Sequence, residues 1–304
     1  MAMDWIIYVL VRAMAGFFRL LPLFAAYPLA ESIALLVYLL DRKHRRIGMI
    51  NLAIAFPEKS PAWRKSVLRR SFLQIGDHAV ELCRLGGISR SDIESRVCYE
   101  PGFGLENYRE AKKQGKGVIF LTAHVGAWEL LPLAHAVLGH PLSFIVRPLD
   151  NRFLDAWGSR LRNQYGNRSV SKFGSIRKLL KILQDREDIG ILIDQNVQEK
   201  NGVFVSLFGK PACTTIAPAA LALKTGAPVV AGFILPDRRK GRYRIRFYPP
   251  LQVSSSGDRE RDIEENTARF VQFLEDVIRR YPHCWLWGHR RFRTQPDGSD
   301  PYLE

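Results

Sequence analysis

The chain has 304 residues, 47% of them hydrophobic and 25% charged, as is ordinary for one large or two smaller globular domains. The 45 Lys and Arg residues exceed the 30 Asp and Glu residues by 15. Such a surplus favours acidic partners: nucleic acid, an anionic membrane, a phosphorylated substrate or an acidic protein. The four cysteines lie far apart without a Cys-x-x-Cys pair. This argues against a zinc site or a disulfide framework and suits a reducing cytosolic environment.

The N-terminal segment, residues 5–40, is largely apolar. Three charged residues interrupt it, and Pro22 and Pro28 interrupt its helical pattern, so the longest charge-free piece, residues 20–30, is too short to cross a bilayer. We predict one or two helices that lie in or dip into a membrane interface. A helical hairpin buried against the domain and a single tilted span are the alternatives. The basic cluster at residues 42–46 suits an anionic cytoplasmic leaflet, with a nucleic-acid patch as its rival.

Beyond this segment, strand and helix patterns alternate along the chain. Helical periods occupy residues 59–86, 128–138, 152–165, 175–187, 214–225 and 262–280. Strand patterns occupy residues 117–123, 142–146, 189–194, 202–208, 227–235 and 242–248, the last of them half-exposed. We therefore predict an α/β fold: a single domain with a mixed, largely parallel sheet flanked by helices, preceded by the N-terminal hydrophobic helical region. The predicted division is residues 1–45 for the membrane-associating helices and 46–304 for the α/β domain.

A histidine and a glutamate, His124 and Glu129, lie five positions apart where the 117–123 strand ends and a helix begins. In open α/β sheets, reactive groups gather outside the carboxyl ends of strands. On one continuous helix the two side chains would point about 140° apart. They meet only if His124 precedes the helix and Glu129 lies in its first turn, with Gly126 allowing the bend. A carboxylate-held histidine is a better base; the alternative is a buried histidine beside an ordinary helix-terminal carboxylate.

The stretch "TAHVGAWE", which contains both residues, resembles the HxxxxE signature of the bacterial lipid A biosynthesis acyltransferases, within the lysophospholipid acyltransferase-like group. The N-terminal apolar segment is also similar to that family's membrane anchor. Further blocks resemble the same family in the same order, and together they cover nearly the whole chain. They are "RPLDN" (147–151), "RLRNQYG" (160–166), "ILIDQN" (191–196), "GVFVSLFGKPACTT" (202–215), "LALKTGAPVV" (221–230) and "WLWGHRRF" (285–292).

The resemblance implies a membrane-bound O-acyltransferase that moves a fatty acyl chain from acyl carrier protein to a hydroxyl of a lipid A precursor. His124 would be the general base that deprotonates this hydroxyl, and Glu129 would orient the His124 ring. No acyl-enzyme would form. An acyl carrier protein thioester, or acyl-CoA, would be the co-substrate, with no cofactor and no metal. The implied partners are acyl carrier protein, a glycolipid acceptor and the membrane surface, not nucleic acid. The implied location is the cytoplasmic face of a bacterial inner membrane.

The matching blocks also imply substrate-binding residues. Arginines there suit a phosphate or a carboxylated sugar, which a guanidinium binds bidentately. The implied set is Arg162, Arg160, Asp194, Gln195, Arg147 and Asn151. Alternatively, Arg162 and Arg160 lie on a solvated helix face, and Asp194 caps a helix. Arg147 and Asn151 would then brace the site. The C-terminal block would form a membrane-facing or substrate-binding lip from Trp285, Trp287, His289 and Arg290.

Two departures from the family pattern leave the acceptor open. Ser206 and Leu207 stand where many relatives carry an acidic residue and a second Phe, and His289 is followed by "RRF" where relatives often end in Trp. An acyltransferase for another glycolipid, similar to those acting on phosphatidylinositol mannosides and using acyl-CoA or acyl carrier protein, is therefore the main alternative. A lipid-binding membrane scaffold without activity is the non-enzymatic one.

Overall fold

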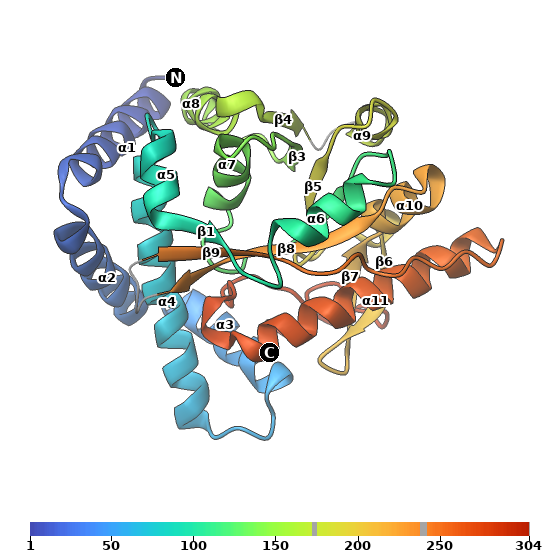
Figure 1. The fold of residues 1–304 in the computed structure, drawn as a ribbon. Helices are drawn as coiled ribbons and strands as arrows, with labels where there is room; N and C mark the ends of the chain where they lie inside the picture. Colours follow the sequence, from blue (N-terminus) through green and yellow to red (C-terminus); the bar gives the residue numbers. More distant parts are fainter. Residues whose placement is uncertain (172–174, 238–241, 304) are drawn as a thin grey trace.

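A seven-stranded sheet runs through the centre of the molecule, in the strand order β1-β9-β8-β2-β5-β3-β4 (Figure 1). The structure, a computed structural model, describes residues 1–171, 175–237 and 242–303. Only the β8–β9 pair is antiparallel among the paired strands of this sheet in the described residues. The predicted α/β class with a mixed, largely parallel sheet is confirmed. The strands are β1 (Val97–Tyr99), β2 (Ile119–Thr122), β3 (Ser143–Val146), β4 (Arg168–Ser171), β5 (Ile189–Leu192), β8 (Val229–Asp237) and β9 (Arg242–Phe247).

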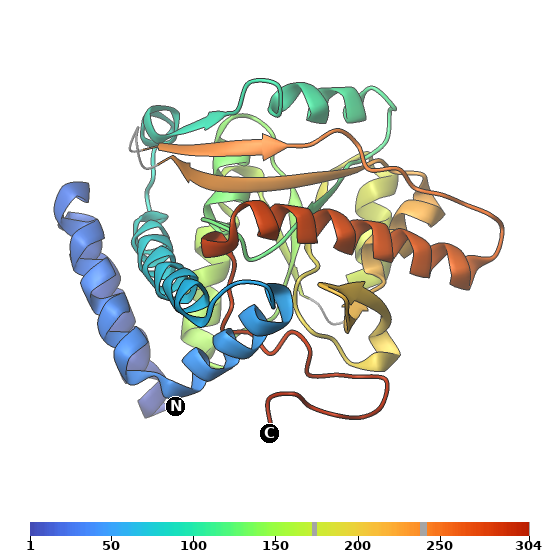
Figure 2. The same ribbon diagram turned by 90° about the horizontal axis from the view of Figure 1, so that it is seen from below.

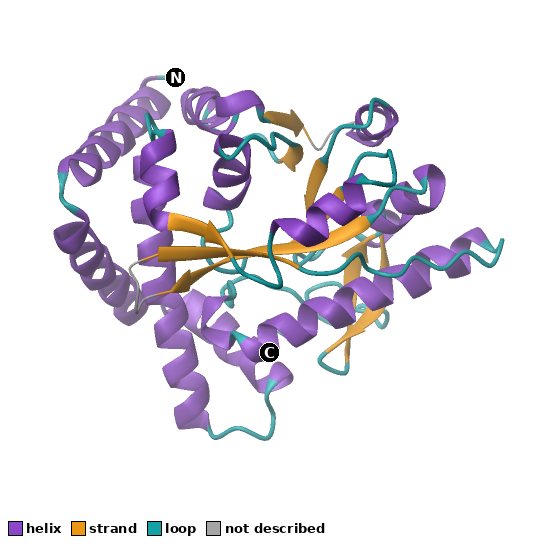
Figure 3. Cartoon of the chain, in the orientation of Figure 1, coloured by secondary structure: helices purple, strands orange, loops and turns teal. Residues whose placement is uncertain are grey.

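Helices surround this sheet, and a separate hairpin of β6 (Gly202–Leu207) and β7 (Lys210–Thr215) stands beside it (Figure 3). The longer predicted elements agree with the structure, except that the helix predicted from residue 214 begins at Ala217, because β7 runs to Thr215. The helices are α1 (Ala2–Leu20), α2 (Leu23–Leu40), α3 (Arg42–Ala55), α4 (Pro61–Arg84), α5 (Arg90–Arg96), α6 (Leu105–Lys112), α7 (Leu130–Val137), α8 (Arg152–Arg162), α9 (Ser175–Gln184), α10 (Ala217–Thr225) and α11 (Arg259–Arg280). Short 3-10 turns occupy Gln164–Gly166, Glu199–Asn201 and Pro282–Cys284.

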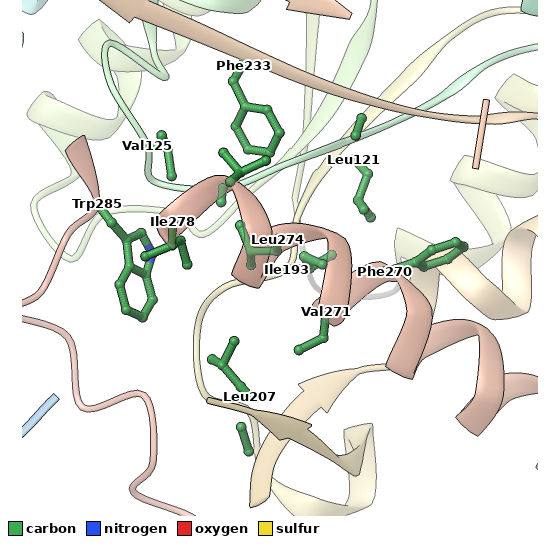
Figure 4. Packing of buried hydrophobic residues seen from close by; sticks show 14 of the residues in the cluster. Leu121, Val125, Ile193, Leu207, Phe233, Phe270, Val271, Leu274, Ile278 and Trp285 are labelled. Carbon is green, nitrogen blue, oxygen red and sulfur yellow. The ribbon is translucent and has the colours of Figure 1, made fainter. Parts of the chain in front are cut away.

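Both faces of the central strands are buried, as parallel strands between helices require. Successive residues of β2 point to opposite faces: Leu121 joins the cluster under α9, α10 and α11, and Phe120 joins the one under α5, α6 and α7. Figure 4 shows α11 contributing Phe270 and Leu274 to the first cluster. This two-sided burial holds the ends of β2 and β5 in place, and the candidate site lies at those ends.

The N-terminal helices α1 and α2 lie on the outer side of α4, as Figures 1 and 2 show. A stripe of small residues on α2, including Ala30 and Ala34, faces α4. A Cβ atom on Gly76 of α4 would lie 2.8 Å from the Ala30 carbonyl oxygen, so only glycine permits this close approach. The opposite side of α2 is apolar and exposed, with Phe24 at 83% and Leu40 at 72% exposure. Helices α1 and α2 thus pack against the domain on one side and leave an apolar face exposed on the other. This is consistent with membrane anchoring.

The prolines of this region act differently from the prediction. Pro22 is the N-cap of α2 and separates it from α1, whereas Pro28 lies inside α2 without ending it. The apolar helix is therefore longer than the charge-free piece suggested. Its 18 residues span about 27 Å, against a bilayer core of about 30 Å. By length and composition, α2 is able to cross a membrane.

The predicted boundary between residues 45 and 46 falls inside α3 (Arg42–Ala55). The helix continues without a break there, and the Asp41 side chain caps its start by accepting from the His44 backbone N–H. The division into a membrane region and an α/β domain stays a prediction, with α3 as the element that joins the two.

Candidate active site

The histidine and an aspartate meet at one edge of the sheet. His124 lies two residues after β2, and Asp194 lies two residues after β5. These strands are parallel neighbours with Thr122 opposite Leu192, so both chains leave the sheet at the same place. Asp194 Oδ1 accepts from His124 Nδ1 at 2.9 Å, and Asp194 Oδ2 accepts from the His124 backbone N–H at 3.0 Å. This carboxylate therefore fixes both the backbone and the ring of the histidine.

Asp194 is 3% exposed, and the indole Nε1 of Trp285 donates to its Oδ2 at 2.9 Å. Burial raises the pKa of Asp194, but His124 and the other donors outweigh it and hold the carboxyl well below its usual range. Burial likewise lowers the pKa of His124, and the Asp194 carboxylate reverses this, so the pKa of the imidazole lies above its usual value. With Nδ1 donating to Asp194, His124 Nε2 carries the lone pair and accepts a hydrogen bond from Gln195 Nε2 at 3.3 Å.

The chain bends between His124 and Glu129 at Gly126, as predicted. Gly126 has a φ of 67°, and a Cβ there would lie 2.0 Å from the Ile234 carbonyl oxygen. Its backbone N–H donates to the Cys284 carbonyl at 2.9 Å. The bend places Glu129 at the N-cap position of α7.

Glu129 pairs with an arginine. Arg162, at the end of α8, donates from Nε to Oε2 at 2.9 Å and from Nη2 to Oε1 at 2.8 Å. Burial raises the pKa of Glu129, but Arg162 outweighs it and keeps the carboxylate ionised. The predicted hydrogen bond from His124 to Glu129 is thus replaced by the one to Asp194, and Glu129 acts on His124 only through its charge, as a smaller cause of the raised pKa. The guanidinium predicted to bind substrate is engaged with Glu129.

An aromatic layer that sequence reasoning missed lies behind these groups. The Trp128 ring centroid is 5.2 Å from that of His124 and 3.8 Å from that of His78 on α4. Burial lowers the pKa of His78 to about 4, so its imidazole is neutral. No sequence pattern pointed to His78, because it reaches the site only through the packing of α4 against the sheet edge.

The C-terminal segment, residues 284–294, crosses the ends of β2 and β5. The Leu286 backbone N–H donates to the His124 carbonyl at 3.1 Å. Arg291, fully buried, donates to the Cys213 carbonyl at 2.8 Å, and His289 Nε2 accepts from the Asn196 backbone N–H at 3.0 Å. Together these bonds hold the C-terminal segment against the residues that follow β2 and β5 and against β7.

The predicted lip is wrong for the two tryptophans of this segment. Trp285 and Trp287 are 2% and 0% exposed, and Trp285 packs among core residues in Figure 4. Their indole N–H groups are satisfied internally, by Asp194 and by the Pro282 carbonyl respectively. Tryptophan occurs both in protein cores, where its N–H finds a partner, and at interfaces. The residue type alone therefore could not distinguish a buried position from an exposed lip.

The remaining predicted site residues lie around this cluster. Asn151 is the N-cap of α8, where its Oδ1 accepts from the Phe153 N–H at 3.0 Å, and its Nδ2 donates to the Asp4 carbonyl of α1 at 2.8 Å. These bonds hold the start of α8 against α1, and substrate binding by Asn151 stays a prediction. Arg147, after β3, is 70% exposed and lies 3.7 Å from Asp150 Oδ1. Arg160 is exposed on α8. Substrate binding by Arg147 and Arg160 stays a prediction.

The assembled groups can move a proton. His124 Nε2 is able to accept one, Asp194 stabilises the resulting charge, and the Gln195 amide adds a donor beside it. Within residues 1–171, 175–237 and 242–303, no three His, Cys, Asp or Glu side chains gather as metal ligands would.

Comparison with known proteins identifies the family. Residues 1–294 match the family model described as bacterial lipid A biosynthesis acyltransferase. The chain is 28% identical over 291 residues to the lipid A biosynthesis lauroyltransferase of Escherichia coli (strain K12), covering 91% of this chain and 88% of that protein. It is 24% identical over 299 residues to the lipid A biosynthesis myristoyltransferase of the same strain, covering 98% and 90%. The resemblance seen in the sequence is confirmed: this chain belongs to the bacterial lipid A biosynthesis acyltransferase family.

Proposed function

We propose that this protein transfers a fatty acyl chain from the thioester of acyl carrier protein to a hydroxyl group of a lipid A precursor. The observation that carries the proposal is the His124–Asp194 pair at the sheet edge, which leaves the lone pair on His124 Nε2, where an acceptor hydroxyl that displaces the Gln195 amide would give up its proton. The relatives named as lauroyl- and myristoyltransferases of lipid A biosynthesis support a fatty acyl chain as the group transferred and lipid A biosynthesis as the source of the acceptor.

The reaction needs one base and no covalent enzyme intermediate. His124 Nε2 takes the proton of the acceptor hydroxyl as its oxygen attacks the thioester carbonyl carbon, forming the new C–O bond. The tetrahedral intermediate then expels the carrier thiolate by breaking the C–S bond, and the thiolate takes the proton back from His124. The products are the ester and the free carrier thiol. Asp194 holds the ring in the tautomer that this step requires and stabilises the imidazolium.

Two neighbouring groups support this step. The Gln195 side-chain amide, 3.3 Å from His124 Nε2, is suited to donate a hydrogen bond to a substrate oxygen near the base. The Glu129–Arg162 pair keeps a negative charge close to the imidazole and contributes to its raised pKa. In this proposal Asp194 takes the orienting role first expected of Glu129, and Arg162 positions Glu129.

The surface of the protein suits both substrates. The exposed apolar faces of α1 and α2 support attachment to the bacterial inner membrane, with the site on the cytoplasmic side where acyl carrier protein is available. The net charge of +15 would attract the acidic carrier and the phosphates of the acceptor. Because exposed charges are screened by salt, the KM for acyl carrier protein should rise with ionic strength.

The test is an acylation assay on the purified full chain in detergent. Acyl carrier protein thioesters of several chain lengths are offered with the tetra-acylated, Kdo-bearing lipid A precursor, and acyl-CoA and a His124→Ala variant run in parallel. Acylation that the substitution abolishes supports the proposal and reports the chain preference. His124-dependent transfer only to another glycolipid, or only from acyl-CoA, would keep the mechanism and replace the substrates. If wild type acylates no hydroxylated lipid of a membrane extract, the acyltransferase proposal fails.

A further inference from the structure

A basic cavity lies where α2, α3 and α4 meet, away from the residues of the candidate active site. Its volume is about 400 Å³. Four cationic side chains line it: Arg42, Arg45, Arg46 and Lys65. Its other lining residues are mostly apolar, among them Met49 and Leu68, and none of the lining residues, all within the described part of the chain, is acidic. The exposed lining is mostly apolar, so the four cationic side chains line the cavity chiefly with their carbon stems and bring their charged ends close to it.

The cavity opens beside the end of the apolar helix α2. Tyr38 belongs both to its wall and to the last turn of α2, and the neighbouring Leu36, Leu39 and Leu40 are exposed. A molecule seated in the cavity would thus be continuous with the uncovered apolar face of the helix. If α2 lies in a membrane, this is the depth at which hydrocarbon gives way to lipid headgroups.

The cations of the cavity are not all used within the protein. Arg45 donates from Nη1 to the last carbonyls of α2, and Arg46 donates from Nη1 to the Tyr302 carbonyl at 2.8 Å. The side chains of Arg42 and Lys65 make no hydrogen bond or ion pair with another described residue. The nearest acidic side chain in sequence, Asp41, is bonded to His44. At least two positive charges are therefore available to a ligand.

The backbone adds to this potential. Arg42 is the first residue of α3 and Pro61 the first of α4, and both residues line the cavity. The start of a helix carries a partial positive charge, but the Asp41 carboxylate already caps α3, so it is the start of α4, capped by the neutral Ser60 hydroxyl, that adds to the four cationic side chains.

We infer that this cavity binds the phosphate headgroup of an anionic phospholipid, with the acyl chains of that lipid lying along the exposed face of α2. The amphipathic lining matches a lipid, which has one anionic end and one apolar end. A docked acidic protein is less suited, since it would need a surface of about 800 Å² on each partner rather than a concave, apolar-floored cavity. The inference rests on the membrane attachment in the proposed function, but not on the catalytic chemistry.

The test compares binding of the full chain to vesicles of phosphatidylcholine alone and to vesicles of phosphatidylcholine and phosphatidylglycerol in equal parts. The test variant is Arg42→Ala/Lys65→Ala, which removes the two cations without internal partners. The matched control is Lys43→Ala/Arg69→Ala, which removes two exposed cations from the same two helices outside the cavity. Circular dichroism and the acylation assay in neutral detergent accompany both variants.

Wild type should bind the anionic vesicles more tightly than the neutral ones. In the test variant this preference should fall by about 30-fold, because each of the two cations contributes about 1 kcal/mol of binding free energy at an anionic surface. The control should keep most of the preference, and both variants should bind neutral vesicles and transfer acyl chains as wild type does. An equal loss in the control would mean diffuse surface attraction and would overturn the site. A raised KM for acyl carrier protein in the test variant would overturn it in favour of carrier docking. Failure of wild type to prefer anionic vesicles would also overturn it, whereas failure of acylation with binding intact would count only against the proposed function.

Discussion

Two carboxylates lie near His124, and they are held by different parts of the molecule. Asp194 is buried just after β5 and accepts three hydrogen bonds. They come from the backbone N–H of His124, from its ring Nδ1 and from the indole Nε1 of Trp285. Glu129 is 20% exposed and is held by the guanidinium of Arg162 alone among these site residues. The first carboxylate depends on the sheet and the C-terminal segment, and the second depends on α8.

Asp194 is thus fixed by the core. Glu129, at the start of α7, is fixed instead through Arg162 of α8, a helix that contacts the N-terminal helix α1. Helix α8 makes such contacts, because Phe153 packs on Trp5 of α1 with ring centroids 5.2 Å apart.

The largest effect should come from removing the base itself. His124→Ala should lower kcat by about 10³-fold or more, since general-base catalysis typically supplies about 10²–10⁴-fold. The measurement is kcat at saturating substrates, with an unchanged melting temperature as the control for folding. Retention of a tenth of wild-type activity would remove His124 from the mechanism.

Asp194→Asn should lower kcat by about 10²–10³-fold, because the ring loses the partner that sets its tautomer. It should also change the pH profile. The neutral imidazole is the active form, so activity falls as pH drops through the pKa of His124. That pKa is raised by Asp194 and lowered by burial. Without the carboxylate, burial dominates and the acid limb of kcat/KM should move to lower pH. An unmoved acid limb would show that Asp194 does not act on the base.

Gly126→Ala tests the bend between His124 and Glu129. The new Cβ would lie 2.0 Å from the Ile234 carbonyl oxygen, at a φ of 67°. The free energy of unfolding should fall by more than about 2 kcal/mol. Gly139→Ala is a control of the same kind, because its φ is also positive but nothing lies within 4 Å of its Cβ. Equal losses in denaturant unfolding would show that the backbone conformation, rather than the contact, is responsible.

Glu129→Gln should reduce kcat by about 10-fold, less than Asp194→Asn, because it removes a charge but no hydrogen bond to the ring. The acid limb should shift in the same direction by a smaller amount, since Glu129 is a lesser cause of the raised pKa of His124. A shift as large as that of Asp194→Asn would mean that the two carboxylates share the orienting role. Arg162→Ala in the same background should add little if Arg162 acts through Glu129.

The smallest effect should come from the start of α8. Asn151→Ala removes its cap and its bond to α1, and should cost about 1 kcal/mol of stability. Arg160→Ala, on the exposed face of the same helix, should change stability by less than about 0.5 kcal/mol. If Arg160→Ala instead raises the KM for the acceptor, its predicted substrate-binding role is supported.

Much of the fold followed from local patterns. The sequence predicts the long helices α4 and α11 because apolar residues recur at helical spacing over several turns. It predicts the buried strands β2, β5 and β8 because each is a continuous run of apolar residues. The edge strands β1 and β4 were not, because three or four residues with partly exposed side chains carry too little periodicity. The short helices α5 and α6 were missed for the same reason.

In the candidate site, residue types and strand ends pointed to His124 and Asp194 separately, as a base and as a substrate contact. That they form one pair depends on β2 and β5 being neighbours, which no local pattern encodes. The nearer residue in sequence, Glu129, was the natural partner to expect, but the bend at Gly126 turned it toward Arg162.

The alternation of apolar runs along the chain was sufficient to establish the α/β class and the apolar N-terminal helices, since these depend on which side chains must leave water. The family signature was sufficient to locate the histidine. The partner of the histidine, the burial of the C-terminal tryptophans and the basic cavity between α2, α3 and α4 arose from the folded chain alone. Each joins residues far apart in sequence, and their proximity is set by strand order and helix packing.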